Sequence, residues 1–393
     1  MKREIYDETH EDFRASFRSF VTTEIVPHHE KWEEAGRVDR DMFAKAGELG
    51  FLGMAVAEEY GGLGQDDFRF NVIIGEELQR AGVIGSGMCI TLHNDVVLPY
   101  LMHATDDDQR RRWLPKMVTG EIMGAISMTE PGTGSDLASI RTTAARIEDS
   151  WVINGAKTFV TNGLNADLYV VAAKTDPGQK RKGISLIAVE DGTEGFTRGR
   201  HLDKIGLRSQ DTAELFFDDA RVPAANLIGG EGKGFSILMQ NLAQERLGLS
   251  ASAISACRTA LGHTVDYCAQ REAFGQRVLD MQNTRFKLAE LAARFDSVEM
   301  LFDRLVLRHN NGEVSGHDAA KAKLLTTELQ QDIVQLGVQL HGGYGFMREY
   351  PIARAYLDAP IQTIFGGTNE IMREIIGRTL ESDYGFAATG GRS

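Results

Sequence analysis

The ten residues from Ser127 to Asp136, SMTEPGTGSD, combine hydroxyl side chains, a proline and two glycines between apolar, strand-like flanks. Glycine adopts backbone angles that other residues avoid, so successive N–H groups and the hydroxyls of Thr129 and Ser135 can converge on one ligand. A phosphate or an electron-rich planar ring suits such donors. The segment therefore indicates a cofactor site, and the alternative is a plain Gly/Pro turn between two strands.

Three further segments carry groups suited to the same kind of ligand. Phe159–Thr161 (FVT) combines an aromatic ring with a hydroxyl, although taken alone its phenylalanine would be a core strand residue. Arg271–Gly275 (REAFG), followed by Gln282, offers a guanidinium group for phosphate, but the pattern also fits a helix C-terminus capped by glycine. Gln339–Phe346 (QLHGGYGF) lets the backbone approach a ligand through its glycines.

Composition and missing motifs exclude several other functions. The chain has neither G-x-G-x-x-G opening a βαβ unit nor G-x-x-x-x-G-K-[ST], which disfavours a nicotinamide site and a Walker loop. Its three cysteines form no CxxC or Cys/His cluster, so we expect no metal and a reducing, cytoplasmic location. The formal charge of −13 disfavours nucleic acid. We expect no targeting presequence and no membrane insertion, because no apolar run is long enough.

Three successive regions have to position these segments. From about residue 8 to 122, apolar residues recur at helical spacing, with breaks at Pro27, at residues 59–64 and at Pro99. Short β-rich runs follow at 151–155, 158–163, 168–173, 184–189 and 213–217. The helical period then returns near 235–270, 281–310, 316–340 and, in a final helix, 369–382. This order predicts an α+β fold with segregated halves.

Together the four segments resemble the signatures of the acyl-CoA dehydrogenase family, over essentially the whole chain. The resemblance implies an N-terminal α-helical domain, a middle β-barrel-like or sandwich domain and a C-terminal four-helix bundle, with boundaries at 1–123, 124–233 and 234–393. It also implies FAD as the cofactor, an acyl-CoA substrate, electron-transfer flavoprotein as the electron acceptor, and a homotetramer.

The resemblance also implies roles for individual residues. Phe159 would cover the flavin ring, Thr161 would reach towards its N5, and Arg271 would bind the FAD diphosphate of a neighbouring subunit. The implied cofactor-binding residues are Ile126, Met128, Thr129, Gly134, Ser135, Phe159, Thr161, Arg271, Phe274, Gln282, Gln339, Gly342, Gly343, Thr368, Asn369 and Glu370. The implied substrate-binding residues are Ser135, Leu242, Arg246, Phe365, Gly366 and Gly367.

The chain departs from the family pattern where many members carry the catalytic glutamate. The implied reaction needs a base that removes the proton α to a thioester carbonyl, and a glutamate in a dry pocket suits this. Many members place it in a Tyr-Glu-Gly-Thr segment, but the aligned stretch Phe365–Thr368 reads FGGT, with Gly366 in its place. Either dehydrogenation is lost, or the base comes from elsewhere, as in the long-chain and isovaleryl branches.

We expect Glu245 to be the base, because Gln244-Glu245-Arg246 matches the segment that supplies the glutamate in those branches. Its neighbours are apolar, which favours a semi-buried acid over a solvated residue paired with arginine. Glycine at 366 would clear space for this carboxylate, while its backbone N–H would still polarise the thioester carbonyl. Glu370, on the final helix, is the alternative acid.

The implied activity is dehydrogenation of an acyl-CoA to the trans-2-enoyl-CoA, with hydride passing from the β-carbon to flavin N5. Residues 210–217 and 366–372 resemble the long-chain branch and favour a medium- to long-chain substrate, for which Gly82, Gly85, Ser86 and Gly87 indicate room. Two alternatives stay open: a branched-chain, isovaleryl-like dehydrogenase, and a flavin oxidase or monooxygenase of the same fold.

Overall fold

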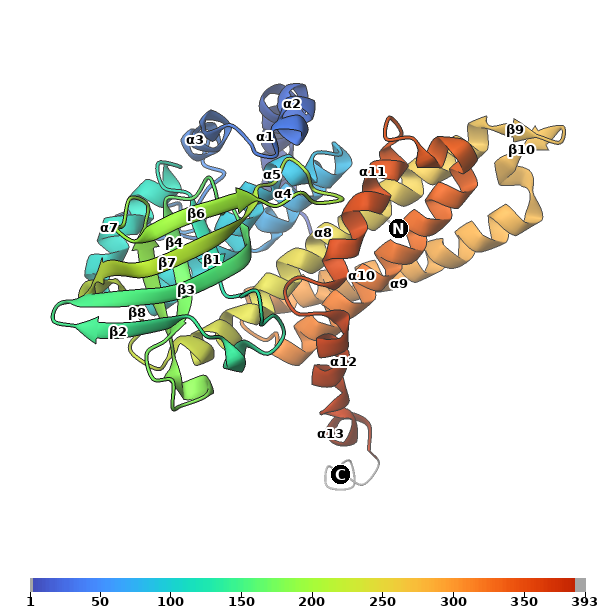
Figure 1. The fold of residues 1–393 in the computed structure, drawn as a ribbon. Helices are drawn as coiled ribbons and strands as arrows, with labels where there is room; N and C mark the ends of the chain where they lie inside the picture. Colours follow the sequence, from blue (N-terminus) through green and yellow to red (C-terminus); the bar gives the residue numbers. More distant parts are fainter. Residues whose placement is uncertain (1–2, 386–393) are drawn as a thin grey trace. The chain divides into compact units, whose positions relative to one another are not determined.

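The computed structural model describes residues 3–385, and the chain divides into two compact units (Figure 1). The N-terminal unit comprises residues 8–241, and the C-terminal unit comprises residues 242–393 together with residues 1–7. In chain order the elements are helices, then a β-sheet, then helices again. The predicted α+β fold is therefore confirmed. The three domain boundaries stay a prediction.

The N-terminal unit begins with helices. They are α1 (Glu8–Phe20), α2 (His29–Ala35), α3 (Arg40–Glu48), α4 (Arg69–Arg80), α5 (Ile84–Leu92), α6 (Leu98–Ala104) and α7 (Asp107–Val118), with π-helical turns η1 (Val21–Ile25) and η4 (His93–Val97). The two prolines expected to break helices, Pro27 and Pro99, each lie at the start of one, where the missing N–H costs no hydrogen bond. A capping box of Asp106 and Gln109 begins α7.

One twisted sheet forms the rest of this unit. Its strands are β1 (Gly124–Ser127), β2 (Thr143–Ile147), β3 (Ser150–Thr161), β4 (Leu168–Lys174), β5 (Ile184–Glu190), β6 (Phe196–His201), β7 (Thr212–Pro223) and β8 (Leu227–Ile228). Their order is β6-β7-β3-β2-β4-β5-β8, and β1 pairs with β4 in parallel. The two runs predicted at 151–155 and 158–163 belong to one strand, β3, whose register shifts between Lys157 and Val160.

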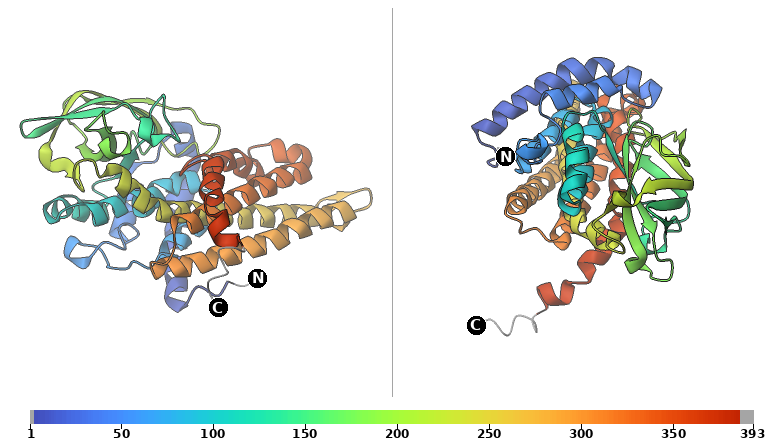
Figure 2. Two further views of the ribbon diagram at one scale, coloured as in Figure 1. Left: turned by 90° about the horizontal axis from the view of Figure 1, so that it is seen from below. Right: turned by 90° about the vertical axis from the view of Figure 1, so that its left-hand side faces the viewer.

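The central strand β4 is apolar along its length because both of its faces are covered. Leu168 and Val170 pack with side chains of α6 and α7, whereas Tyr169 and Val171 pack with side chains of β3 and β7. Successive side chains of a strand point to opposite faces, so a strand covered on both sides needs no polar positions. Figure 2 shows this unit from two further sides, with helices against one face of the sheet.

Two of the glycines between α4 and α6 do not provide the expected room for an acyl chain. A Cβ on Gly87 would lie 2.2 Å from a methyl group of Leu78, and one on Gly85 would lie 2.8 Å from the hydroxyl of Ser209. These two glycines serve close packing, so the prediction of space is wrong at both. A Cβ on Gly82, which has φ +70° just after α4, would meet nothing within 4 Å.

The C-terminal unit is helical. Its helices are α8 (Gly234–Gln270, in this unit from Leu242), α9 (Gln282–Asn310), α10 (Gly316–His341), α11 (Pro351–Asp358), α12 (Asn369–Gly377) and α13 (Leu380–Tyr384). A hairpin of β9 (Glu272–Ala273) and β10 (Gln276–Arg277) joins α8 to α9 (Figure 1). The long helices agree with the sequence periodicity. The single final helix predicted at 369–382 is wrong, because the chain leaves the helix after Gly377, a weak helix former.

Candidate active site

The loop that follows β1 is held in place by a buried carboxylate. Glu130 is 6% exposed, and its two oxygens accept hydrogen bonds from the backbone N–H groups of Arg141 at 2.6 Å and Thr142 at 2.9 Å. The ammonium group of Lys157, on β3, donates to Glu130 at 2.9 Å and to the carbonyl of Met128 at 3.1 Å. The loop backbone is thereby fixed on both sides of Thr129.

Glu130 and Lys157 form an ion pair that is almost completely removed from water. Burial lowers the pKa of Lys157 to about 8, because a charged amine loses its hydration, and the nearby carboxylate opposes this effect. Burial alone would raise the pKa of Glu130, but Lys157 and the hydrogen-bond donors hold it below its ordinary value. Both groups are therefore charged at neutral pH.

The start of this loop and the C-terminal part of β3 lie side by side. The carbonyl of Thr129 accepts a hydrogen bond from the backbone N–H of Thr158 at 2.9 Å, and Gly134 and Ser135 are exposed beyond it. At the β3 irregularity Phe159 has φ 57°, and its side chain is 68% exposed. The core position suggested by its strand pattern is therefore wrong: the bulge turns the ring outwards. Thr161 follows on the same strand.

The first two of the predicted cofactor segments are thus brought together in the N-terminal unit. The exposed ring of Phe159 and the exposed loop tip can face a planar ligand, since aromatic rings stack on flat, electron-rich groups. Ile126 lies within β1 and Met128 directly after it, both half-buried. Sequence spacing alone could not show this proximity, which depends on hydrogen bonds from Lys157 and Thr158 to the loop.

In the C-terminal unit, Glu245 and Arg246 lie on α8 and are each 5% exposed. The Nε of Arg246 donates to the carbonyl of Gly366 at 3.3 Å, which joins α8 to the turn before α12. Burial lowers the pKa of Arg246, and the charge of Glu245 opposes this shift. The two adjacent residues are both withdrawn from water, as the apolar neighbours of Glu245 suggested.

Gly366 is required by packing as well as by conformation. Its φ is +63°, and a Cβ there would lie 2.3 Å from a methyl group of Leu249, one turn after Glu245. A side chain at 366 would therefore need both a strained backbone and a displaced α8 side chain. Within this unit, the space next to Gly366 that a side chain would occupy is filled by Leu249 and not by the carboxylate of Glu245. Leu242 and Phe365 are half-buried.

A buried lysine that the sequence reasoning missed anchors the same turn. Lys323 on α10 is 0% exposed, and its ammonium group donates to the carbonyl of Gly367 at 2.8 Å and to the side-chain oxygen of Asn369 at 2.9 Å. Burial, assisted by the charge of Arg246, lowers the pKa of Lys323 to about 8. Thr327, one turn later, also hydrogen-bonds Asn369. In the sequence, the feature that could have pointed to Lys323 is its place among small apolar residues of a helix.

We expect Lys323→Met to lower kcat by about 10- to 100-fold, because it would displace the Gly366 N–H, which the resemblance implies as the donor to the substrate carbonyl. We also expect a loss of about 1–3 kcal/mol in the free energy of unfolding, since buried acceptors lose their donor. Steady-state kinetics and thermal unfolding measure both effects. Lys321→Met, which removes a neighbouring lysine of the same helix, is the control. Equal behaviour of the two variants would show that Lys323 does not position the turn.

The alternative acid, Glu370, lies in a different environment. Its side chain is 79% exposed, and it begins α12 beside Thr368, whose hydroxyl accepts a hydrogen bond from the backbone N–H of Ile371 at 3.3 Å. Backbone and side-chain hydrogen bonds lower the pKa of Glu370. A base that works near neutral pH needs the opposite shift. The surroundings of Glu370 therefore do not suit proton abstraction.

The third and fourth predicted segments meet around a cavity of about 390 Å³ in the C-terminal unit. Arg271 lies at the end of α8, and Gly342 and Gly343 lie just after α10. The lining residues are Tyr267, Arg271, Val278, Leu340, His341, Gly342, Gly343, Tyr344 and Met347. A guanidinium group beside glycines suits a phosphate-containing ligand. Gln339 lies in the last turn of α10 and Gln282 at the start of α9.

The residues after Arg271 form the β9–β10 hairpin, so the alternative of a helix C-terminus capped by Gly275 is wrong. At its tip Phe274 has φ 53° and is 98% exposed, and Phe346 after α10 is 82% exposed.

Within residues 3–385 no group of three or more His, Cys, Asp or Glu side chains could hold a metal ion. The same described part of the chain contains no helix that is long and apolar enough to cross a membrane. The three cysteines are free and buried.

Comparisons with known proteins agree with this architecture. Family models described as the N-terminal, middle and C-terminal domains of acyl-CoA dehydrogenase match residues 7–121, 125–220 and 232–381. The mitochondrial long-chain specific acyl-CoA dehydrogenase of Mus musculus is 45% identical over 97% of this chain and 88% of that protein. An acyl-CoA dehydrogenase structure from Geobacillus kaustophilus is 48% identical, with a TM-score of 0.93, and the match covers 96% of this chain and 100% of that one.

A third similar protein carries a ligand. The crystal structure of an acyl-CoA dehydrogenase complexed with FAD from Bacillus anthracis is 31% identical, with a TM-score of 0.89. The match covers 97% of this chain and 68% of that one.

Proposed function

The chain belongs to the acyl-CoA dehydrogenase family, and we propose that it uses FAD to convert an acyl-CoA thioester into the trans-2-enoyl-CoA, with Glu245 as the base. The observation that carries this assignment is a buried carboxylate, 5% exposed, next to an arginine that hydrogen-bonds the Gly366 turn. Gly366 itself leaves the family's other base position without a carboxylate.

The residues present fit an FAD molecule. The exposed ring of Phe159 would supply a stacking face for the flavin, and Thr129, whose carbonyl bonds the neighbouring Thr158, would supply a donor together with Ser135. Arg271 and the two glycines after α10 supply a phosphate-binding cavity. When bound, FAD would accept the hydride that leaves the β-carbon of the substrate. Arg271, Phe274, Gly342 and their neighbours would contact the FAD of a neighbouring subunit, as the resemblance implies.

The chain's own residues account for the other half of the reaction. Glu245 would remove the proton from the α-carbon, and burial favours this because a carboxylate with little hydration is a stronger base. The backbone N–H of Gly366 would donate to the thioester carbonyl, where negative charge develops as the proton leaves. Lys323 and Arg246 would hold this N–H in place through their bonds to the two glycine carbonyls.

We favour a medium- to long-chain substrate and electron-transfer flavoprotein as the acceptor. The substrate length is supported by 45% identity to the long-chain specific enzyme of the mouse. The electron acceptor is supported by the resemblance alone. An isovaleryl-like preference for branched chains is the second candidate, since that branch also places its base on α8. The cytoplasm stays a prediction, because this mouse relative is mitochondrial.

A homotetramer is part of the same proposal. It is supported by the exposure of two large apolar side chains in the same unit, Phe274 at 98% and Phe346 at 82%. Burial of such side chains in an interface would contribute about 1.5–3 kcal/mol for each one covered.

Anaerobic titration of the FAD-loaded protein with saturated acyl-CoA thioesters of increasing length tests the activity. We expect the flavin absorbance near 450 nm, about the usual maximum of oxidised flavin, to bleach, most strongly with medium to long chains. Short or branched thioesters serve as the comparison series. A protein that binds FAD but is bleached by no thioester would contradict the proposed function, and strongest bleaching by isovaleryl-CoA would assign the branched-chain alternative.

A further inference from the structure

Two cations are buried around the turn of Gly366 and Gly367 in the C-terminal unit. Arg246, on α8, is 5% exposed, and its Nε donates to the carbonyl of Gly366 at 3.3 Å. Lys323, on α10, is 0% exposed, and its ammonium group donates to the carbonyl of Gly367 at 2.8 Å. A Cβ on Gly367 would lie 3.7 Å from an Nη atom of Arg246. Both cations are therefore held against the same two peptide groups.

Neither cation is neutralised by a carboxylate. The side-chain hydrogen bonds of Arg246 and Lys323 all go to uncharged oxygens, and neither side chain forms an ion pair with any of residues 3–385. The nearby acids are Glu245, which is buried beside Arg246, and Glu370, whose side chain is 79% exposed. Buried charges are normally paired, because an ion without hydration or a counter-ion is costly. The turn therefore carries an excess of positive charge that would attract an anion.

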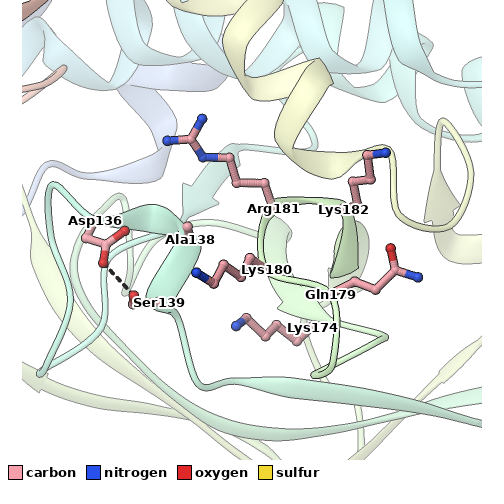
Figure 3. A pocket seen from close by; sticks show the side chains of 8 residues that line it. All are labelled: Asp136, Ala138, Ser139, Lys174, Gln179, Lys180, Arg181 and Lys182. Carbon is pink, nitrogen blue, oxygen red and sulfur yellow. Dashed lines mark hydrogen bonds between the residues drawn. The ribbon is translucent and has the colours of Figure 1, made fainter.

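Other cations of the chain lie in the opposite environment. A cavity of about 650 Å³ in the N-terminal unit is lined by Lys174, Lys180, Arg181 and Lys182 (Figure 3). The last three of these side chains are exposed, so water solvates them and they need no counter-ion. Arg246 and Lys323 lack this solvation. Their charge therefore acts much more strongly on a neighbouring group.

We propose that the charge of Lys323, beyond holding the turn, stabilises the negative charge that develops on the thioester oxygen of the substrate; this inference rests on the proposed function. Glu245 would take the α-proton, and the electron pair of the broken C–H bond would move onto that oxygen, which the Gly366 N–H is implied to bind. A cation behind the turn acts on this anion but hardly on the neutral thioester. Lys323 would contact neither substrate nor cofactor, so it is a positioning residue that acts through the turn.

Lys323 can lose its charge without losing its hydrogen bonds. A neutral amine keeps two N–H donors, and Lys323 has two acceptors, the carbonyl of Gly367 and the side-chain oxygen of Asn369. Burial lowers the pKa of Lys323 to about 8, the charge of Arg246 on α8 assists this shift, and the charge of Glu370 on α12 opposes it. A rise in pH through this value would therefore remove the charge and leave the turn in place.

The first measurement compares binding of an anion with binding of a neutral ligand by the FAD-loaded protein. A 3-oxoacyl-CoA ionises at its α-carbon to an enolate and has no β-hydrogen to transfer, whereas the trans-2-enoyl-CoA stays uncharged. We expect Lys323→Met to weaken enolate binding, relative to enoyl-CoA binding, by about tenfold or more, since a nearby cation shifts an acid's pKa by about one unit or more. Lys323→Arg, which keeps the charge, should restore the ratio. Lys321→Met, from the same helix, is the control.

The second measurement uses the unmodified protein, so it decides the question even if a variant does not fold. At saturating acyl-CoA, the rate of flavin reduction should fall about tenfold as the pH rises through about 8, because Lys323 then loses its charge but keeps its bonds. Lys323→Arg should show no such fall, because arginine stays protonated in this range. Stopped-flow absorbance under anaerobic conditions measures both rates.

Three results would overturn the inference. The ratio of enolate to enoyl-CoA affinity could be unchanged in Lys323→Met. The ratio could fall while the rate in the unmodified protein stays constant through pH 8, which would assign the effect to the position of the turn alone. Lys323→Met could regain its enolate affinity once saturated with FAD, which would assign the charge to a cofactor phosphate. Failure of the proposed function is distinguishable, because no acyl-CoA would then reduce the flavin of the unmodified protein.

Discussion

Glu245→Gln is expected to lower the rate of flavin reduction by acyl-CoA by about 10²- to 10⁴-fold, the range assigned to a positioned general base. Glutamine has nearly the shape of glutamate but cannot accept the α-proton. Since Glu245 is 5% exposed and its neighbours are apolar, the variant should fold and retain FAD. Stopped-flow absorbance under anaerobic conditions measures the rate, and the visible spectrum of the purified variant measures FAD content.

Glu370→Gln is the matched control for this experiment. Its side chain is 79% exposed and its pKa is lowered, so its replacement should leave most of the activity. Full activity in Glu245→Gln together with loss in Glu370→Gln would assign the base to α12. If both variants lose activity and also lose FAD, impaired cofactor binding is the common cause.

Glu130→Gln is expected to reduce the free energy of unfolding by about 3–5 kcal/mol, because it leaves the buried ammonium group of Lys157 without its anion. Glutamine keeps one of the two oxygens, so it can accept from the backbone N–H of either Arg141 or Thr142 but not from both, and the loss of one hydrogen bond adds to the loss of charge. Chemical denaturation measures it. Glu121→Gln, which breaks an exposed pair with Lys116, should cost less than about 1 kcal/mol.

The effect of Glu130→Gln should depend on pH in a defined direction. The pKa of Lys157 is about 8 in the folded protein, below its ordinary value, and the loss of Glu130 would lower it further. The folded state then binds this proton more weakly than the unfolded state, so a rise in pH favours folding. The variant should therefore recover part of its stability between neutral pH and about pH 8. A deficit that is constant with pH would show that packing, and not charge, is responsible.

Periodicity predicted the fold well because long helices and buried strands repeat one pattern over many residues. α8, α9 and α10 follow the predicted segments closely, and β4 and β5 follow their apolar runs. Short or irregular elements such as β1 and β8 have too few residues to show a period. The spacing of Gly85 and Gly87 indicated space, but a glycine in sequence looks the same whether it opens a cavity or admits a neighbour such as Leu78.

The candidate site was predictable where a motif carried the chemistry, and not where distant residues cooperate. The segments containing Ser135 and Arg271 were found from residue types alone. The role of Lys323 was not, because it depends on two hydrogen bonds to a turn more than forty residues away.

The most direct test of the central assignment is exchange of the substrate α-proton with solvent, followed by mass spectrometry in D₂O. A 3-thia-acyl-CoA has sulfur in place of the β-carbon, so it can lose the α-proton but no β-hydride. We expect the FAD-loaded protein to incorporate deuterium at the α-carbon, Glu370→Gln to do the same, and Glu245→Gln to show only the uncatalysed rate. Undiminished exchange in Glu245→Gln would contradict the assignment of Glu245 as the base.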